Sequence, residues 1–334
     1  MKKTFSILLN FVVFPSIGTL LLYFAFKDID LHKLWADLKN ANFYWIGLSL
    51  IFALLGFASR ALRWKLLMEP LGYKPSAKNT ILAVITAYFA NLAMPRLGEI
   101  TRCGSLNKTD HIPIDKLFGT VISERVIDFI TLLILIGVVL IMKFNQVGGF
   151  FKDNVLTPLY EKYFSSSFFW MVAIVTLICL VLVIYFFRKV IIKNILFQRI
   201  SNFFKGLITG LKSVFKMKKI GLFLAHTFFI WTMYTLMTYV VFFAIDPTKN
   251  LTFLDSIFIL SIGGLGMSAP VQNGFGAYHW IVSLGLMLYG ISQADGLLYA
   301  TICHESQTLM ILVLGPIAMV MIFLTKKKKQ ITES

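Results

Sequence analysis

The sequence predicts an all-α membrane protein, with about six full transmembrane helices and two re-entrant helical hairpins in an inverted-repeat arrangement. Of its 334 residues, 57% are hydrophobic and only 14% are charged, against about 25% charged residues in a soluble domain. Long apolar runs recur along the chain. The net charge of +16 gathers between these runs, which is typical of the positive-inside rule and not of a nucleic-acid-binding domain.

Each full span is predicted from an apolar run of about 20 residues, the length that crosses the hydrocarbon of a bilayer. The first run exceeds the apolar part of a signal peptide and no A-x-A-like cleavage site follows it, so we expect a retained span. We expect residues 1–334 to form a single integral membrane domain. The predicted spans are 5–26, 43–60, 120–142, 169–187, 221–245 and 298–325.

Two further apolar stretches are too short or too broken to be ordinary spans. Residues 79–94 end at Pro95, and 16 residues of helix measure only about 24 Å. Residues 256–291 are interrupted by the polar and glycine-rich sequence GMSAPVQNGFGAY at 266–278. Both stretches therefore predict pairs of short helices.

The basic residues of the loops predict how these segments are oriented. Segment 188–219 carries nine Lys and Arg residues and no acid, so we expect it in the cytoplasm with both termini. If 79–94 crossed the membrane completely, this segment would face outward. We therefore expect 79–107 to enter and leave from the cytoplasm with Pro95 near its tip, and 256–291 to enter and leave from outside.

The resulting order predicts two halves of opposite orientation, as in many transporters. The first repeat is expected over 5–142 and the second over 169–325, each with a hairpin before its last span. The basic segment 188–220 is interpreted either as a helix lying on the inner leaflet or as a plain cytoplasmic linker. Residues 326–334 are expected to form a basic cytoplasmic tail.

Ionisable residues within the predicted spans are the first candidates for function, because a charge at membrane depth costs at least a few kcal/mol. Glu124 and Asp128 are four residues apart and share one helical face. A functional cluster and a structural ion pair with Arg96 or Arg102 both remain open. The residues expected to balance charge or couple to protons are Glu99, Glu124, Asp128, His304 and Glu305.

The hairpin tips are candidates for anion binding, because a broken helix leaves free N–H groups and a positive dipole end. Arginine binds phosphate through two parallel hydrogen bonds, and the lipid-phosphate candidates are Arg96, Arg102 and Arg125. The glycines of these tips either let a ligand approach the backbone or serve only as turn residues. The candidate tip residues are Pro95, Gly98, Pro270, Gly274 and Gly276.

The remaining arginines of the second span and the cysteines do not point to a particular ligand. Arg60, Arg63 and Trp64 end the second span, where we interpret them as an interfacial anchor or as headgroup contacts. Cys303 adjoins His304, but one such pair does not form a zinc site, and the cysteines have no metal-ligand spacing. The sequence contains no GxxxxGK[ST], HExxH or GxSxG motif, so no cofactor or metal is expected.

Four stretches in order resemble one known family: SRALRWKLLMEPLG (59–72), FANLAMPRLGEITR (89–102), VISERVIDFITLL (121–133) and GGLGMSAPVQNGFGAY (263–278). Together the chain resembles the lysylphosphatidylglycerol synthase transmembrane region, the flippase half of the multiple peptide resistance factor, over about residues 5–325. The resemblance implies a lipid-translocating domain with facing re-entrant hairpins. The sequence PVQNGFGAY replaces the P-G-G-x-G-like tip that is common in the family.

We therefore expect a flippase-like transporter that moves a phosphate-headgroup lipid, such as a phospholipid or a polyprenyl-phosphate lipid. We expect no soluble aminoacyltransferase domain of the kind found in two-part relatives, so that activity and enzymatic activity in general are not expected. The alternatives are an intramembrane enzyme acting on a lipid headgroup or lipid-linked sugar, with Glu124 or Asp128 as acid or base, and a non-catalytic subunit beside a separate lipid-modifying enzyme. The expected location is the bacterial cytoplasmic membrane, and the expected partner is an anionic lipid.

Overall fold

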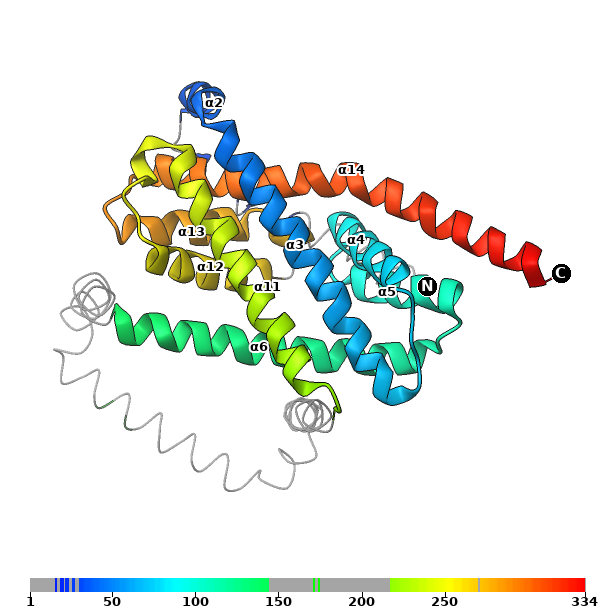
Figure 1. The fold of residues 1–334 in the computed structure, drawn as a ribbon. Helices are drawn as coiled ribbons and strands as arrows, with labels where there is room; N and C mark the ends of the chain where they lie inside the picture. The colour runs from blue at the N-terminus through cyan, green and yellow to red at the C-terminus, as the bar shows by residue number, and fades with distance from the viewer. Residues whose placement is uncertain are drawn as a thin grey trace.

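The computed structural model describes residues 31–143, 217–269 and 271–333, with isolated positions between 16 and 30 and residues 171 and 174. Every regular element in these ranges is a helix, which confirms the all-α prediction (Figure 1). Four predicted features lie almost wholly outside the described residues: the spans at 5–26 and 169–187, the basic segment 188–220, and Pro270.

Four helical segments in the described residues are long and apolar enough to cross a membrane, and each coincides with one of the predicted spans. Three of them extend beyond the apolar run that predicted them, because the helices continue through neighbouring polar residues, whereas the segment from Ile220 to Ala244 matches the predicted span 221–245 to within one residue at each end. These segments are Phe43–Leu71 (α3 with η1), Ile114–Met142 (α6), Ile220–Ala244 (α11 with η4) and Gln293–Thr325 (within α14, Gln293–Glu333).

Two pairs of shorter helices occupy the two broken apolar stretches. The pairs are α4 (Ala77–Ala93) with α5 (Leu97–Asp110), and α12 (Phe253–Met267) with α13 (Ala277–Met287). At 1.5 Å per residue these helices measure between about 16 and 26 Å, which is less than the ~30 Å of bilayer hydrocarbon. The prediction of paired short helices is confirmed, and their depth in a membrane stays a prediction.

The turn between α4 and α5 is built around Pro95. Met94 is extended, with φ −152° and ψ 137°, as expected for a residue before proline. Arg96 then adopts the left-handed conformation, with φ 64°, and α5 begins. Gly98 is required for the return, because a Cβ atom there would lie 2.4 Å from the carbonyl oxygen of Ala87 in α4.

The turn between α12 and α13 has a similar construction. Residues Asn273, Gly274 and Gly276 all have positive φ, so the chain reverses around the short helix η6 (Gln272–Gly274). A Cβ atom on Gly266 would lie 2.9 Å from the Cα of Tyr278, so the backbones of α12 and α13 also touch. Glycines at both turns thus let two helices pack closely.

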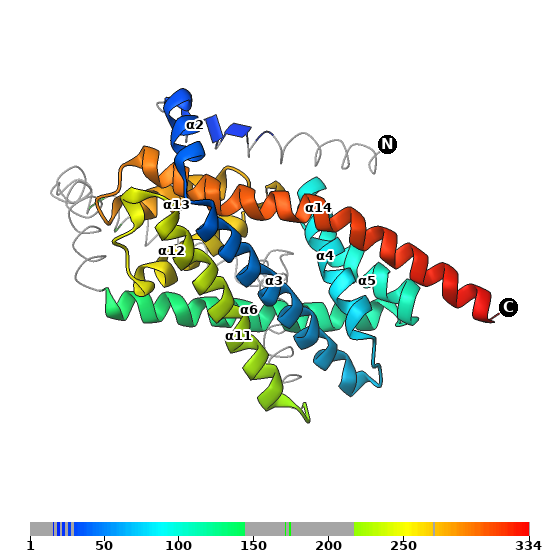
Figure 2. The same cartoon turned by 45° about the horizontal axis from the view of Figure 1, so that its top comes forward.

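The two sets of helices make matching contacts. In the first set α3 packs on α4 and α5 packs on α6, and in the second set α11 packs on α12 and α13 packs on α14. Across the sets α4 packs on α14 and α12 packs on α6. Figure 2 shows α14 passing α4 and α5 toward the C-terminus.

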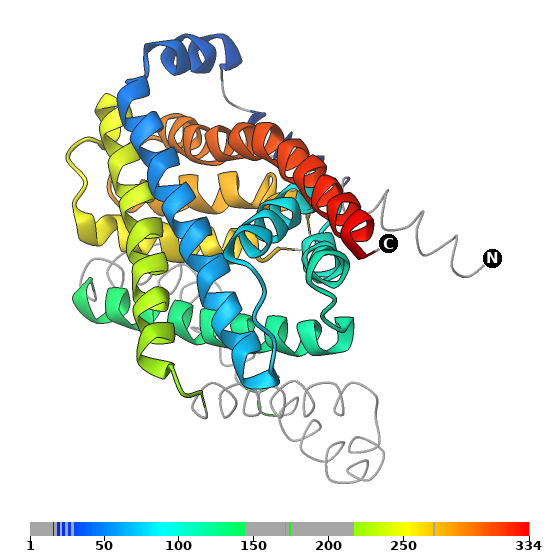
Figure 3. The ribbon, with the colours of Figure 1, turned by 45° about the vertical axis from the view of Figure 1, so that its right-hand side comes forward.

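Helices α3 and α11 lie side by side along their length (Figures 1 and 3). Gly56 faces Tyr234, and the Ser59 hydroxyl lies 2.8 Å from Nδ1 of His226. Arg63 lies over the ring of Phe223. Contact positions on α11 fall as those on α3 rise, so the two helices are antiparallel.

Two large apolar cores lie mainly within one set of helices each. One core lies around Trp64 and Leu106 and joins α3, α4, α5 and α6, and the other lies around Phe242 and Tyr299 and joins α11, α12, α13 and α14. Between the first predicted span and α3 lies a short amphipathic helix, α2 (Leu31–Asn40). The remaining short helices are η1 (Glu69–Leu71), η4 (Phe242–Ala244) and η5 (Asp246–Thr248).

Candidate functional site

A buried cluster of charges joins α3, α5 and α6. Its members are Arg60 and Arg63 of α3, Arg102 of α5, and Glu124 and Asp128 of α6, and we call it the arginine–carboxylate network. Glu124 has no exposed surface, and it accepts from Arg60 Nε at 2.7 Å and from Arg102 Nη1 at 2.7 Å. Asp128 accepts from Arg63 Nη2 at 2.6 Å and from Arg60.

Helical spacing explains why these side chains meet. Arg60 and Arg63 are three residues apart on α3, while Glu124 and Asp128 are four apart on α6, so each pair lies on one face of its helix. Trp64 packs beside them, and its ring lies 4.6 Å from the guanidinium carbon of Arg102. The Trp64 indole N–H donates to the Thr120 hydroxyl at 2.9 Å, which fixes the ring between α3 and α6.

A pocket opens beside this network between α3, α4, α5 and α6, and we call it the arginine pocket. Its lining combines guanidinium groups, one carboxylate and the first residues of α5. The lining residues are Arg60, Val84, Ala87, Tyr88, Asn91, Gly98, Glu99, Arg102 and Arg125.

Two residues that line the arginine pocket have buried polar atoms without a partner in the described part of the chain. Arg102 Nε and Nη2 and Glu99 Oε2 are all buried, and none of them has a hydrogen-bond partner within the described part of the chain. Buried polar atoms are rarely left in this state, because each costs a few kcal/mol of desolvation. Arg125 is half-exposed and pairs with Glu99 Oε1 at 3.1 Å across the pocket.

The charges of the network and pocket do not cancel. Together they hold four arginines (60, 63, 102 and 125) and three carboxylates (Glu99, Glu124 and Asp128), which leaves one positive charge in excess. A buried, uncompensated charge is costly in a low-dielectric environment. An anion in the pocket would remove this imbalance.

The structure places the site residues predicted between positions 95 and 128 at three locations. Arg102, Arg125, Glu99 and Gly98 line the arginine pocket. Arg96 is exposed at the turn and is not among the lining residues, and Pro95 stays in the turn beside it. Glu124 and Asp128 lie in the network behind the pocket.

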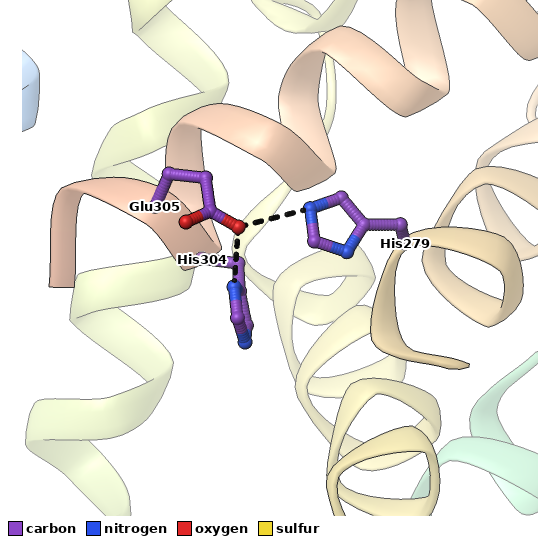
Figure 4. A group of neighbouring side chains, drawn as sticks. All are labelled: His279, His304 and Glu305. Carbon is purple, nitrogen blue, oxygen red and sulfur yellow. Dashed lines mark hydrogen bonds and ion pairs between the residues drawn. The ribbon is translucent and has the colours of Figure 1, made fainter. Parts of the chain in front are cut away.

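The other predicted charged residues, His304 and Glu305, form a second group with a residue that the sequence analysis missed. His304 Nδ1 lies 2.9 Å from Glu305 Oε1, and His279 Nε2 lies 3.5 Å from the same oxygen (Figure 4). We call these residues the histidine–glutamate group. Gly274 and Gly276 belong to the turn that precedes His279, and Asn273 of this turn contacts His304.

Arg60 and Arg63 do not lie where the sequence predicted them. They were expected at the membrane interface, but Arg63 has no exposed surface and Arg60 is 8% exposed. The sequence did contain an indication of this pairing. Two arginines three residues apart in one apolar helix can form ion pairs with two acids four residues apart in another apolar helix. The sequence indicated His279 as a site residue less clearly, because it is only a single ionisable residue just after the glycine-rich turn.

Fold and charges together define a class: a helical, multi-pass membrane protein in which paired short helices bring buried charges to the long helices. Sequence comparison agrees, since the chain matches the lysylphosphatidylglycerol synthase TM region family over residues 7–315. The protein belongs to this family.

One relative is the UPF0104 membrane protein MJ1595 of Methanocaldococcus jannaschii. It is 32% identical over 152 residues, which cover 45% of this chain and 43% of the archaeal protein. The matched region thus spans less than half of that relative. No solved structure matches the chain.

Proposed function

We propose that the protein is a flippase-like transporter of the cytoplasmic membrane, and that it moves a lipid whose phosphate headgroup binds in the arginine pocket. Membership of a family named for a lipid synthase links the chain to lipid handling. The site supports an anionic ligand, because a positive charge is in excess beside a small pocket that the arginines line.

The observation that carries the proposal is the free edge of Arg102. Its Nη1 donates to Glu124 at 2.7 Å, while Nε and Nη2, which share the opposite edge of the guanidinium, have no partner in the described residues. This edge is the fork that binds two oxygens of a phosphate at once. Stacking on Trp64 holds the guanidinium plane in place.

Other groups in the pocket refine the ligand. The first turn of α5 adds the positive end of a helix dipole, which favours an anion. Glu99 Oε2 is an acceptor without a partner among the described residues, so it suits a headgroup that carries a hydroxyl or ammonium donor beside its phosphate.

The arrangement of the helices supports alternating access between two related halves. Helices α3 and α11 each precede a pair of short helices, make matching contacts and run antiparallel. Antiparallel equivalents are what an inverted repeat requires. In this proposal both helix pairs are re-entrant, α4 with α5 from the cytoplasm and α12 with α13 from outside, because each helix is shorter than the hydrocarbon layer.

A liposome assay tests the proposal. Purified protein is reconstituted with a fluorescent phosphatidylglycerol, or with a fluorescent glucosylceramide that lacks phosphate, and an impermeant quencher reports the inward-facing fraction over time. We expect the phosphatidylglycerol to cross at least tenfold faster than in protein-free liposomes, and the glucosylceramide to remain near the protein-free rate. Mass spectrometry of the recovered lipid is expected to show no chemical change.

The matched variants are Arg125→Gln, which removes a half-exposed pocket cation, and Lys108→Gln, which removes an exposed cation from the same region of the fold. Arg125→Gln is expected to slow phosphatidylglycerol about tenfold, and Lys108→Gln to leave the rate within twofold. Equal rates for the two lipids, or for the two variants, would refute the arginine pocket as the transport site.

A further inference from the structure

We propose that the histidine–glutamate group binds a divalent transition metal of the zinc type. His279 lies in α13, and His304 and Glu305 lie in α14, so a metal here would tie the second short-helix pair to the last long helix. The proposal concerns a site separate from the arginine pocket and does not depend on transport.

The spacing of the three side chains fits one small ion. One ligand atom from each residue lies within 4.8 Å of the other two, and two of the separations are 2.9 Å and 3.5 Å. Ligands that bind zinc tetrahedrally at ~2.0–2.1 Å are about 3.3 Å apart. Both histidine nitrogens point at the same carboxylate oxygen (Figure 4), so a small closing movement around an ion completes the geometry.

Hydrogen bonding favours a metal-ready form of His304. Its Nε2 lies 2.8 Å from the backbone carbonyl oxygen of Asn273, which only accepts, so Nε2 carries a hydrogen. The side-chain amide of Asn273 is farther away, at 3.4 Å. In the neutral ring, Nδ1 then presents a lone pair to the Glu305 carboxylate at 2.9 Å. Two acceptors at this distance require a cation or a proton between them.

The contact with Asn273 is also the type of support that metal-bound histidines usually have, a ring N–H donated to a backbone carbonyl. His279 is 2% exposed, and its Nδ1 has no partner within the described ranges. A doubly protonated His279 would therefore bury a charged N–H without an acceptor. The neutral ring avoids this cost and leaves Nε2 available to a metal.

Charge balance gives a further reason. Glu124 of α6 is neutralised by guanidinium groups, whereas Glu305 of α14 has only the two histidines as ion-pair partners among the residues described. A divalent ion with two neutral histidines and one carboxylate would compensate this acid. Glu305 is 34% exposed, so one side of the ion remains open to water or to an anionic oxygen.

Metal titration of the full-length protein in detergent tests the proposal. Bound metal is first removed with a chelator, and the protein is then titrated with Zn²⁺ or Co²⁺ and dialysed. Bound Zn²⁺ is measured by elemental mass spectrometry, and Co²⁺ binding is followed by its visible absorption. We expect about one ion per chain, and a Co²⁺ spectrum typical of tetrahedral coordination. No binding by the wild-type protein would overturn the proposal and assign the group to a proton instead.

Variants locate the bound ion. His279→Ala and Glu305→Gln are each expected to weaken Zn²⁺ binding at least tenfold, while His226→Ala, which changes a histidine of α11 that contacts Ser59, is expected to change it less than twofold. Unchanged affinity in the first two variants would place the ion elsewhere and refute the site. Size-exclusion profiles check that each variant is folded, and if either fails to fold, the wild-type Co²⁺ spectrum decides the question.

Discussion

Replacing Glu124 with glutamine is expected to destabilise the protein by about 3–5 kcal/mol, the usual cost of removing one partner from a buried ion pair. Glu124 is fully buried and accepts hydrogen bonds from both Arg60 and Arg102. The glutamine has nearly the same shape, so packing is preserved. The loss arises because two guanidinium groups remain buried while the negative charge between them is gone.

Thermal unfolding in detergent measures this effect. At about 2 °C of melting temperature per kcal/mol for a chain of this size, the variant is expected to melt roughly 6–10 °C below the wild type. Glu69→Gln is the matched control, because Glu69 pairs with Lys219 at the surface, where their side chains are 23% and 55% exposed. A surface pair contributes less than about 1 kcal/mol, so this control should melt within about 2 °C of the wild type.

A second substitution separates charge from packing. Adding Arg60→Gln to Glu124→Gln lowers the positive charge left in excess in the network, while Asp128 keeps Arg63 as its partner. We expect the double variant to regain about 1–2 kcal/mol, within the range of coupling energies of contacting residues. If Glu124→Gln melts as Glu69→Gln does, or if the second substitution adds a further full loss, the buried-charge reasoning is wrong.

Three other predictions concern the backbone and one ion pair, and thermal unfolding checks each. Gly98→Ala is expected to lower the free energy of unfolding by about 1–3 kcal/mol, because its Cβ would lie 2.4 Å from a backbone oxygen of α4. Gly104→Ala is the control, because a Cβ there would have no heavy atom within 4 Å. The control is expected to be neutral or to stabilise by up to about 1 kcal/mol. Arg96→Gly is expected to stabilise by about 1 kcal/mol, since it relieves a left-handed residue; a loss of stability would show that the arginine side chain makes a structural contact. Lys143→Met is expected to cost about 2 kcal/mol, because Lys143 pairs with the nearly buried Asp255 at 2.9 Å, and an unchanged melting temperature would contradict this.

The helical class and the paired short helices could be predicted from sequence because they depend on local properties. A run of 16 apolar residues that ends at Pro95 is too short for a full span, whatever surrounds it. The polar, glycine-rich stretch at 266–278 breaks a helix for equally local reasons. The ends of the helices were less predictable. Helix α3 continues through Arg60 and Arg63 to Met68, because the acidic residues of α6 neutralise these two arginines.

The site itself was only partly predictable, because its contacts join distant parts of the chain. A pair between Glu124 and Arg102 was one expected alternative, and it is present at 2.7 Å. The partnership of Arg60 with Glu124 could not be read from either segment alone, since an arginine at the end of an apolar run equally suits a membrane interface. His279 meets Glu305 only because α13 packs on α14.

Arg102 links the stability of the fold to the proposed function without making one depend on the other. Its Nη1 donates to Glu124, whereas its Nε and Nη2, on another edge of the guanidinium, have no partner among the described residues, and Arg102 lines the arginine pocket. An anion that takes this free edge therefore leaves the bond to Glu124 intact, so the network need not open each time a headgroup enters or leaves. On this reasoning a pocket variant such as Arg125→Gln should slow transport at nearly normal melting temperature, because Arg125 is half-exposed and lies outside the network. Glu124→Gln should instead lower the melting temperature first. Variants in which both properties always fell together would show that the pocket and the network are a single structural unit.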